Sequence, residues 1–269
     1  MDKLKKISSL NYAFAIGKIR VLERFLIKQE VFEEAIESNL GEALKIFVES
    51  DLYTDELLYI KDSQGLEQAL GKELGKLKGL IQDLLLDKRL LGLMQPDTLE
   101  QMQKIASSYP SQFLKDYVLH LTDMHNIKSF LRLYILKEPL AKLKEVLVSS
   151  GFIPKEDFLR LYTQDLTLFL KRLEYVHKDA EIIDYADFLR EAIQKVEKEH
   201  SFVALEKVIN DFLIQVLKPA KYISFGPEPL LAYYFAKVNE MNLMRMIILA
   251  KLNNLLADTI KERLNLVYA

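Results

Sequence analysis

The sequence predicts an all-helical protein. Only 9 glycines and 7 prolines occur in 269 residues, whereas leucine, lysine, glutamate and alanine are abundant. Few turn residues and many helix formers leave little room for the tight turns that a β-sheet protein needs. Hydrophobic residues make up 50% of the chain, which excludes a disordered polar chain and is enough for a sizeable core.

Apolar residues that recur every three or four positions predict the helices of the N-terminal half. The first covers residues 12–27, and its apolar stripe, which begins at Phe14, is expected to be buried. Short helices are predicted over residues 30–36 and 41–48, and one long helix over residues 63–94. Small side chains on one face of that helix would let another helix approach closely. These are Gly71, Gly75 and Gly79.

Prolines mark several helix starts after residue 94, because proline is well tolerated in a first helical turn. Pro96, Pro110 and Pro139 each precede a predicted helix, and the second of these helices runs to Lys137. The remaining predicted features, in order, are a short helix pair bounded by Gly151, Pro154 and Asp157, helices over 182–200 and 202–217, a loop over 225–229, a helix over 230–254 and a last helix capped by Asp258.

Charge and composition exclude several classes of protein. The 37 basic and 39 acidic residues leave a net charge of -2, whereas nucleic-acid binding needs a basic surface. No cysteine occurs, so disulfides and thiolate metal sites are excluded. The most apolar stretch, residues 230–257, is interrupted by four charged residues, each of which would cost roughly 2.5–3.5 kcal/mol at the centre of a bilayer. The chain is therefore expected to be soluble.

A weak internal repeat suggests how the chain is organised. Asn11-Tyr12, Asn126-Ile127 and Asn242-Leu243 are about 115 residues apart, and each precedes a basic amphipathic helix. No linker rich in glycine, serine or proline separates these segments. The sequence thus predicts one chain of three related helical units without sharp domain boundaries.

The titratable residues predict no catalytic, cofactor or metal site. Glu174-His177 and Glu197-His200 match the Glu-x-x-His pattern of di-iron bundles. They stand at the ends of successive predicted helices, and a 20-residue helix spans roughly 30 Å, so an antiparallel hairpin would separate them. Asp116 and His120 are expected to make a surface contact. Nucleotide-binding loops and nucleophile elbows are absent from the sequence.

Three segments carry a resemblance to a known family. Residues 225–240, Phe-Gly-Pro-Glu-Pro-Leu-Leu-Ala-Tyr-Tyr-Phe-Ala-Lys-Val-Asn-Glu, are followed by related patterns at 246–253 and 260–264. Residues 123–127 with Leu131-Arg132 form a second element, and residues 12–26 a third. Together they resemble the family of central-stalk C subunits of the V/A-type ATPases, known as d subunits in eukaryotes. The chain departs from that pattern at Leu121, where an acid is usual, at Asn242, which is one residue early, and in its shorter length.

The resemblance implies a fold and a function. The family's fold is three helical units in a pseudo-threefold funnel, here expected as residues 1–60 with 225–269, 61–137 and 138–224. Its function would be that of a non-catalytic rotor part, a socket that couples the central axle of D and F subunits to the proteolipid ring during ion transport or ATP synthesis. The coupled ion stays open between proton and sodium.

The resemblance also implies a location and an interface. The protein would be cytoplasmic and held at the membrane through the ring, without cofactor, nucleic acid or small-molecule ligand. The candidate interface residues are Arg20, Asn126, Arg132, Phe225, Glu228, Glu240, Arg245 and Lys251. Two alternatives remain at this point: a helical-repeat adaptor of another assembly, and a helical di-metal oxidase.

Overall fold

The computed structural model describes residues 8–50, 53–179 and 181–269, and within them the predicted all-α class is confirmed. The chain divides into two compact units. Unit 1 contains the described residues up to Gln95 together with Ile214–Ala269, and unit 2 contains Pro96–Leu213. This division rests on contacts within each unit and says nothing about structural repeats. The three predicted helical units and their pseudo-threefold arrangement therefore stay predictions.

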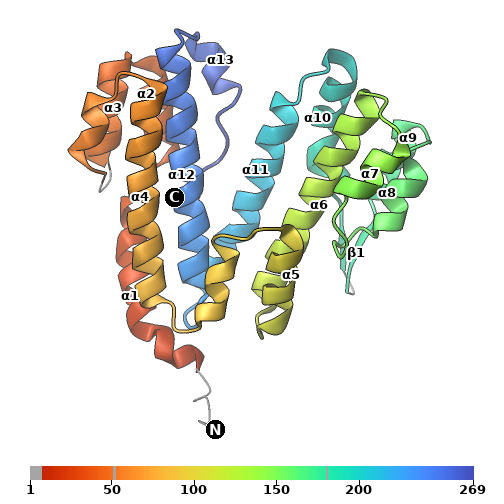
Figure 1. Cartoon of the computed structure of the whole chain (residues 1–269), viewed down its shortest axis with the longest axis horizontal. Coiled ribbons are helices and arrows are strands. Elements are labelled where there is room, and N and C mark those ends of the chain that lie inside the picture. The colour runs from red at the N-terminus through yellow and green to blue at the C-terminus, as the bar shows by residue number, and fades with distance from the viewer. Residues whose placement is uncertain (1–7, 51–52, 180) are drawn as a thin grey trace. The chain divides into compact units, whose positions relative to one another are not determined.

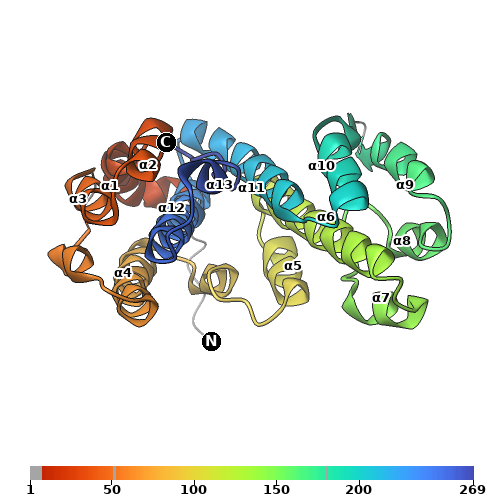
Figure 2. The same cartoon turned by 90° about the horizontal axis from the view of Figure 1, so that it is seen from above.

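Unit 1 is built around one apolar helix, α12 (Figures 1 and 2). This helix buries most of its residues between Pro229 and Ala250, because apolar side chains lie on several of its faces and outnumber the polar ones. It packs against the four helices of the N-terminal segment. The helices of unit 1 are α1 (Ala13–Leu22), α2 (Gln29–Glu37), α3 (Leu40–Ser50), α4 (Ser63–Leu84), α12 (Glu228–Leu252) and α13 (Ala257–Lys261), with 3-10 helices at Ser9–Tyr12, Glu23–Phe25, Asp55–Tyr59, Lys88–Leu93 and Lys218–Tyr222.

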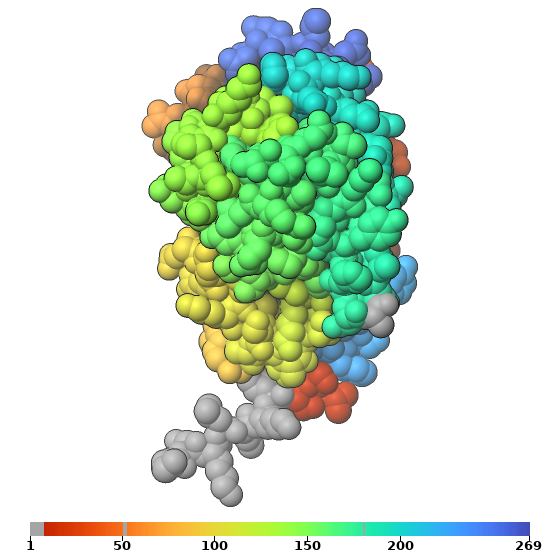
Figure 3. All heavy atoms as spheres, turned by 90° about the vertical axis from the view of Figure 1, so that its right-hand side faces the viewer, coloured from red at the N-terminus to blue at the C-terminus, as the bar shows by residue number. Residues whose placement is uncertain are grey.

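Unit 2 is centred on the long helix α6, which begins after Ser111, whose hydroxyl caps the amide of Leu114. Phe130 of α6 stacks on Phe169 with ring centroids 4.1 Å apart, in the middle of a continuous apolar cluster. The elements of unit 2 are α5 (Leu99–Ser108), α6 (Gln112–Ile135), α7 (Leu140–Val146), α8 (Lys155–Leu161), α9 (Leu166–Leu173), β1 (Val176–Lys178), β2 (Glu181–Ile183), α10 (Ala186–Glu199) and α11 (Val203–Leu217), which ends in unit 1. The segment from α8 to β1, in green, lies in the middle of the face of unit 2 seen in Figure 3.

Two predicted helices are wrong in their extent. Residues 63–94 do not form one helix, since α4 ends at Leu84 and a 3-10 helix follows. The buried carboxylate of Asp87 caps that second helix at the amide of Arg89, and the Asp87 amide donates to the hydroxyl of Tyr12. These contacts fix a bend that helical periodicity alone does not reveal.

The second correction concerns residues 182–200. Ile182 and Ile183 lie in an antiparallel hairpin, in which Val176 pairs with Ile183 and His177 with Ile182, and α10 begins only at Ala186. Asp258 also does not cap the last helix, because it lies inside the first turn of α13.

Candidate subunit interface

The loop before α12 exposes one aromatic side chain and fixes the start of the helix. Phe225 is 49% exposed, whereas Pro227 and Pro229 are buried. Gly226 adopts a φ of 119°, a backbone conformation that favours glycine, and a Cβ there would overlap the carboxylate of Glu228. Glu228 stands in the first turn of α12, where an acid is favoured by the helix dipole.

Arg20 joins α1 to the segment that leads into α12. Its guanidinium pairs with Glu23 at 2.7 Å and donates at 2.9 Å to the carbonyl oxygens of Ala220 and Ile223. A planar guanidinium has donors for all three acceptors at once. Arg20 therefore holds two segments of unit 1 together, 200 residues apart in the sequence.

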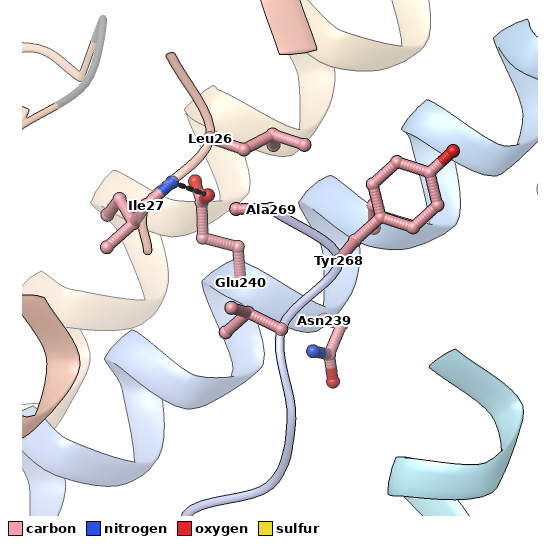
Figure 4. A pocket seen from close by; sticks show the side chains of 8 residues that line it. Leu26, Ile27, Asn239, Glu240, Tyr268 and Ala269 are labelled. Carbon is pink, nitrogen blue, oxygen red and sulfur yellow. Dashed lines mark hydrogen bonds between the residues drawn. The ribbon is translucent and has the colours of Figure 1, made fainter. Parts of the chain in front are cut away.

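Glu240 is a buried carboxylate at the centre of unit 1. Its oxygens accept the backbone N–H of Ile27 at 2.7 Å and the hydroxyl of Tyr53 at 2.8 Å. Lys237 pairs with the same carboxylate, and its ammonium lies 4.0 Å from the ring centroid of Tyr53. Burial, and then the Glu240 charge, raises the pKa of Tyr53 well above its usual range. Figure 4 shows this carboxylate beside Ile27, with Tyr268 of the C-terminal segment lining the same small pocket.

The partners of Arg245 and Lys251, the two basic residues in the C-terminal half of α12, also lie in unit 1. Arg245 pairs with Glu67 of α4 at 2.8 Å and donates to the Asn242 side chain at 2.7 Å. Lys251 donates to the carbonyl oxygens of Ile36, at 2.8 Å, and Ser38. These carbonyls stand at the C-terminal end of α2, where a cation stabilises acceptors that have no helical partner.

In unit 2 the two candidate interface residues differ in burial. Asn126 is fully buried, and its side-chain amide makes two hydrogen bonds with the backbone of Val148. Its Nδ2 donates to the Val148 carbonyl oxygen at 2.8 Å, and its Oδ1 accepts the Val148 N–H at 2.9 Å. Arg132 is half exposed, pairs with Glu206 at 2.7 Å and lies 5.5 Å from the ring centroid of Phe202. Asn126 thus holds the segment that follows α7 in place, whereas Arg132 lies on the surface.

The interface roles of these eight residues stay predictions, but the structure adds a surface that the sequence analysis missed. Along α1 and its flanking turns runs an exposed row that we call the α1 apolar face. Its large side chains, with their exposed fractions, are Leu10 (62%), Phe14 (80%), Val21 (58%) and Phe25 (43%). A Cβ built on Gly17, between Phe14 and Val21, would meet nothing within 4 Å, so the row has a notch at its middle.

The α1 apolar face corrects one prediction and has a simple cause. The sequence predicts Phe14 in the buried stripe, yet the buried residues of α1 are Ala15, Ile16 and Ile19. This helix carries more apolar residues than one face can bury, so a second row remains in solvent. The surplus is the signal in the sequence that could have revealed it. Exposed Lys18 and Arg24 flank the row.

Unit 2 contains a buried polar cluster formed by Asp123, His120 and Tyr185. Tyr185 donates to Asp123 Oδ2 at 3.0 Å, and its hydroxyl lies 2.8 Å from His120 Nδ1. The same carboxylate accepts the amides of Phe152 and Ile153, both at 3.1 Å. The predicted surface contact between Asp116 and His120 is wrong, since His120 is only 6% exposed and Asp116 pairs with Lys178 at 2.8 Å.

The two Glu-x-x-His segments do not form the pattern of a di-iron bundle. Glu174 ends α9 and pairs with Arg190 at 2.6 Å, whereas His177 lies on strand β1. His200 ends α10 in the left-handed conformation. Among the described residues there is no group of three or more acidic or histidine side chains that could hold a metal ion. Within the same residues no helix has the length and apolar character needed to cross a membrane.

Comparisons with known proteins agree on one family. The family model described as the ATP synthase (C/AC39) subunit matches residues 83–263. The C subunit of the V-type sodium ATPase of Enterococcus hirae is 29% identical over 160 residues, which are 60% of this chain and 45% of that relative. The matched region therefore spans less than half of the relative's length.

Proposed function

Because the chain belongs to the ATP synthase (C/AC39) subunit family, we propose that it is a non-catalytic rotor component of a V/A-type rotary ATPase. In this role it couples the central axle, made of D and F subunits, to the proteolipid ring of the membrane sector. The family match over residues 83–263 is the observation that carries the proposal. The protein is held at the membrane by the ring and has no reaction of its own.

The packing of the units supports a mechanical role. A part that transmits torque has to resist bending, and stiffness follows from long helices joined by buried contacts. In unit 1 the central helix α12 is tied to the N-terminal segment by the Glu240, Arg245 and Lys251 side chains. These bonds join segments about 180 to 215 residues apart in the sequence, so the unit resists opening between its two ends.

We place the contact with the axle on the α1 apolar face. Several large exposed apolar side chains along one helix are typical of surfaces that bind another protein. The notch at Gly17 admits a large side chain of the partner between Phe14 and Val21. Lys18 and Arg24 at its edges favour a partner helix whose apolar row is flanked by acidic residues. Exposed Phe225, before α12, belongs to the same proposed contact area.

The experiment measures binding of the full chain to purified axle proteins. The double variant Phe14→Ser with Val21→Ser should weaken binding by at least about tenfold, which corresponds to a loss of about 1.4 kcal/mol. Both side chains are more than half exposed, so the melting temperature should not fall. The matched control is Leu256→Ser, at a 76% exposed position of the same unit, and it should leave binding unchanged.

The binding results test the proposed function and the proposed contact surface separately. Absence of any binding between the unmodified chain and either the axle proteins or the ring complex would overturn the proposed function. Binding that the double variant does not weaken would overturn only the placement on the α1 apolar face.

A further inference from the structure

The buried cluster of unit 2 is a continuous chain of exchangeable protons. His120 and Asp123 both project from α6, and Tyr185 immediately precedes α10. The exposed fractions are 6% for His120 and 0% for both Asp123 and Tyr185. The hydroxyl of Tyr185 stands between the other two groups, 2.8 Å from His120 Nδ1 and 3.0 Å from Asp123 Oδ2.

No cation neutralises the Asp123 carboxylate within the described residues. Arg172 of α9, whose charge lowers the pKa of Asp123, is engaged by Asp157 at 2.7 Å and by the Tyr175 carbonyl. Burial raises the pKa of Asp123 to about 7, against the opposing hydrogen bonds from Ile153, Tyr185 and Phe152. The carboxyl therefore titrates near neutrality.

His120 stays neutral over the same range. Phe152 and Phe212 pack on its ring, with centroids 4.9 and 5.1 Å away. Burial, and then the charge of Lys178 on β1, lowers the pKa of His120 to about 4, while Asp116 one turn earlier on α6 acts in the opposite direction. A neutral imidazole carries its proton on one ring nitrogen, so His120 can adopt either the Nδ1–H or the Nε2–H tautomer.

The single proton of the Tyr185 hydroxyl makes the three groups interdependent. An ionised Asp123 can only accept, so Tyr185 donates to it, and His120 must donate its Nδ1–H to the Tyr185 oxygen. A protonated Asp123 donates from Oδ2 to that oxygen. Tyr185 then donates to His120 Nδ1, and the imidazole must carry its proton on Nε2.

We propose that His120, Tyr185 and Asp123 form a proton relay whose hydrogen bonds reverse direction when Asp123 takes up a proton. One proton arrives at His120 Nε2, the Nδ1 proton passes to the Tyr185 oxygen, and the Tyr185 proton passes to Asp123 Oδ2. One solvent proton is gained, no electrons move, and the His120 tautomer changes from Nδ1–H to Nε2–H.

The relay acts on the loop between α7 and α8. Asp123 Oδ2 accepts the Phe152 amide as well as Tyr185, whereas Oδ1 accepts the Ile153 amide. A protonated hydroxyl oxygen is a poorer acceptor than a carboxylate oxygen, so uptake of the proton weakens the bond from Phe152 and leaves the bond from Ile153. The loop is thereby loosened at one amide as the pH falls.

The test is nuclear magnetic resonance of the labelled full chain between pH 5 and 8.5. Long-range proton–nitrogen spectra should show the Nδ1–H tautomer of His120 at high pH and the Nε2–H tautomer at low pH. Its midpoint should coincide with that of the Asp123 carboxyl carbon, near 7. Hydrogen exchange of the Phe152 amide, corrected for its intrinsic pH dependence, should rise roughly tenfold relative to Ile153 below the midpoint. His125, whose Nε2 lies 3.4 Å from the Val146 carbonyl, is the internal control that should not follow Asp123.

The variant Tyr185→Phe removes the linking hydroxyl. In this variant the His120 tautomer should no longer change with Asp123, even though both rings remain packed. A single His120 tautomer across the whole pH range would overturn the relay, as would a tautomer change that persists in Tyr185→Phe. If that variant does not fold, different midpoints for His120 and Asp123 in the unmodified chain would overturn it equally.

Discussion

The carboxylate of Glu240 accepts the backbone N–H of Ile27 at 2.7 Å, across 213 residues of sequence. The amide belongs to the extended segment between α1 and α2, and the acid to the centre of α12. One buried side chain thus joins the N-terminal and C-terminal parts of unit 1.

Glu240→Ala should destabilise unit 1 strongly. The substitution leaves the Ile27 amide, the Tyr53 hydroxyl and the Lys237 ammonium without their common buried acceptor. Loss of one partner of a buried charged network costs roughly 3–5 kcal/mol in the free energy of unfolding. Urea unfolding measures this loss. The matched control, Glu67→Ala, removes the half-exposed partner of Arg245 and should cost less than about 1 kcal/mol. Equal losses in the two variants would contradict the assigned role of Glu240.

Two glycine-to-alanine substitutions should change the free energy of unfolding in opposite directions. Gly75 lies in the middle of α4, where an added Cβ would meet nothing within 4 Å, so Gly75→Ala should raise the free energy of unfolding by about 1 kcal/mol. At Gly151 the added Cβ would overlap the Asp123 carboxylate, which the Ile153 amide holds in place, so Gly151→Ala should lower it by about 1–3 kcal/mol. Calorimetric unfolding of both variants measures whether each substitution stabilises or destabilises the protein. A stabilised Gly151→Ala protein would show that the carboxylate moves freely.

The pH dependence of stability should separate Asp123 from His120. The folded pKa of Asp123, about 7, is above its ordinary 3.8, so its stabilising contribution is complete below pH 3.8 and is lost as the pH rises through 7. The folded pKa of His120, about 4, is below its ordinary 6.5, so its contribution is present above pH 6.5 and is lost as the pH falls through 4. Between pH 5 and 7 the two contributions have opposite slopes and largely cancel.

Single variants should remove this cancellation. Asp123→Asn should leave a protein whose free energy of unfolding rises from pH 5 to pH 7, and His120→Gln one whose free energy falls over that range. Each change should be roughly 2 kcal/mol, at about 1.4 kcal/mol per unit of pKa shift. Urea unfolding at both pH values provides the measurement. Parallel slopes in the two variants would contradict the burial of one or both groups.

Attachment to membranes should not depend on lipid. The proposed rotor role attaches the chain to partner subunits of the membrane sector, so we expect proteins and not lipid to hold it at the membrane. Low ionic strength with a chelator, or a mild chaotrope, should release it from membranes of cells that produce the whole complex. Immunoblotting of supernatant and pellet measures the release. Release by detergent alone would contradict attachment through proteins.

The class of fold and the family could both be predicted from the residues alone. Helix formation depends on interactions within one or two turns, so apolar spacing and the positions of prolines were enough to place most helices, including α6 after Pro110 and α12, whose start at Glu228 lies two residues before the predicted one. The family resemblance, which rested on residues 225–240 in particular, was confirmed by the match over residues 83–263.

Features that depend on contacts between distant segments could not be predicted in this way. The end of α4 at Leu84 follows from the contact of Asp87 with Tyr12, 75 residues away. The burial of His120 depends on Tyr185, and the partners of Lys251 lie at the end of α2. Residue spacing fixes which side chains share a face of a helix, but it does not specify which face meets another helix. That choice is made by the packing of the whole unit, which buried Ile16 and Ile19 and left Phe14 in solvent.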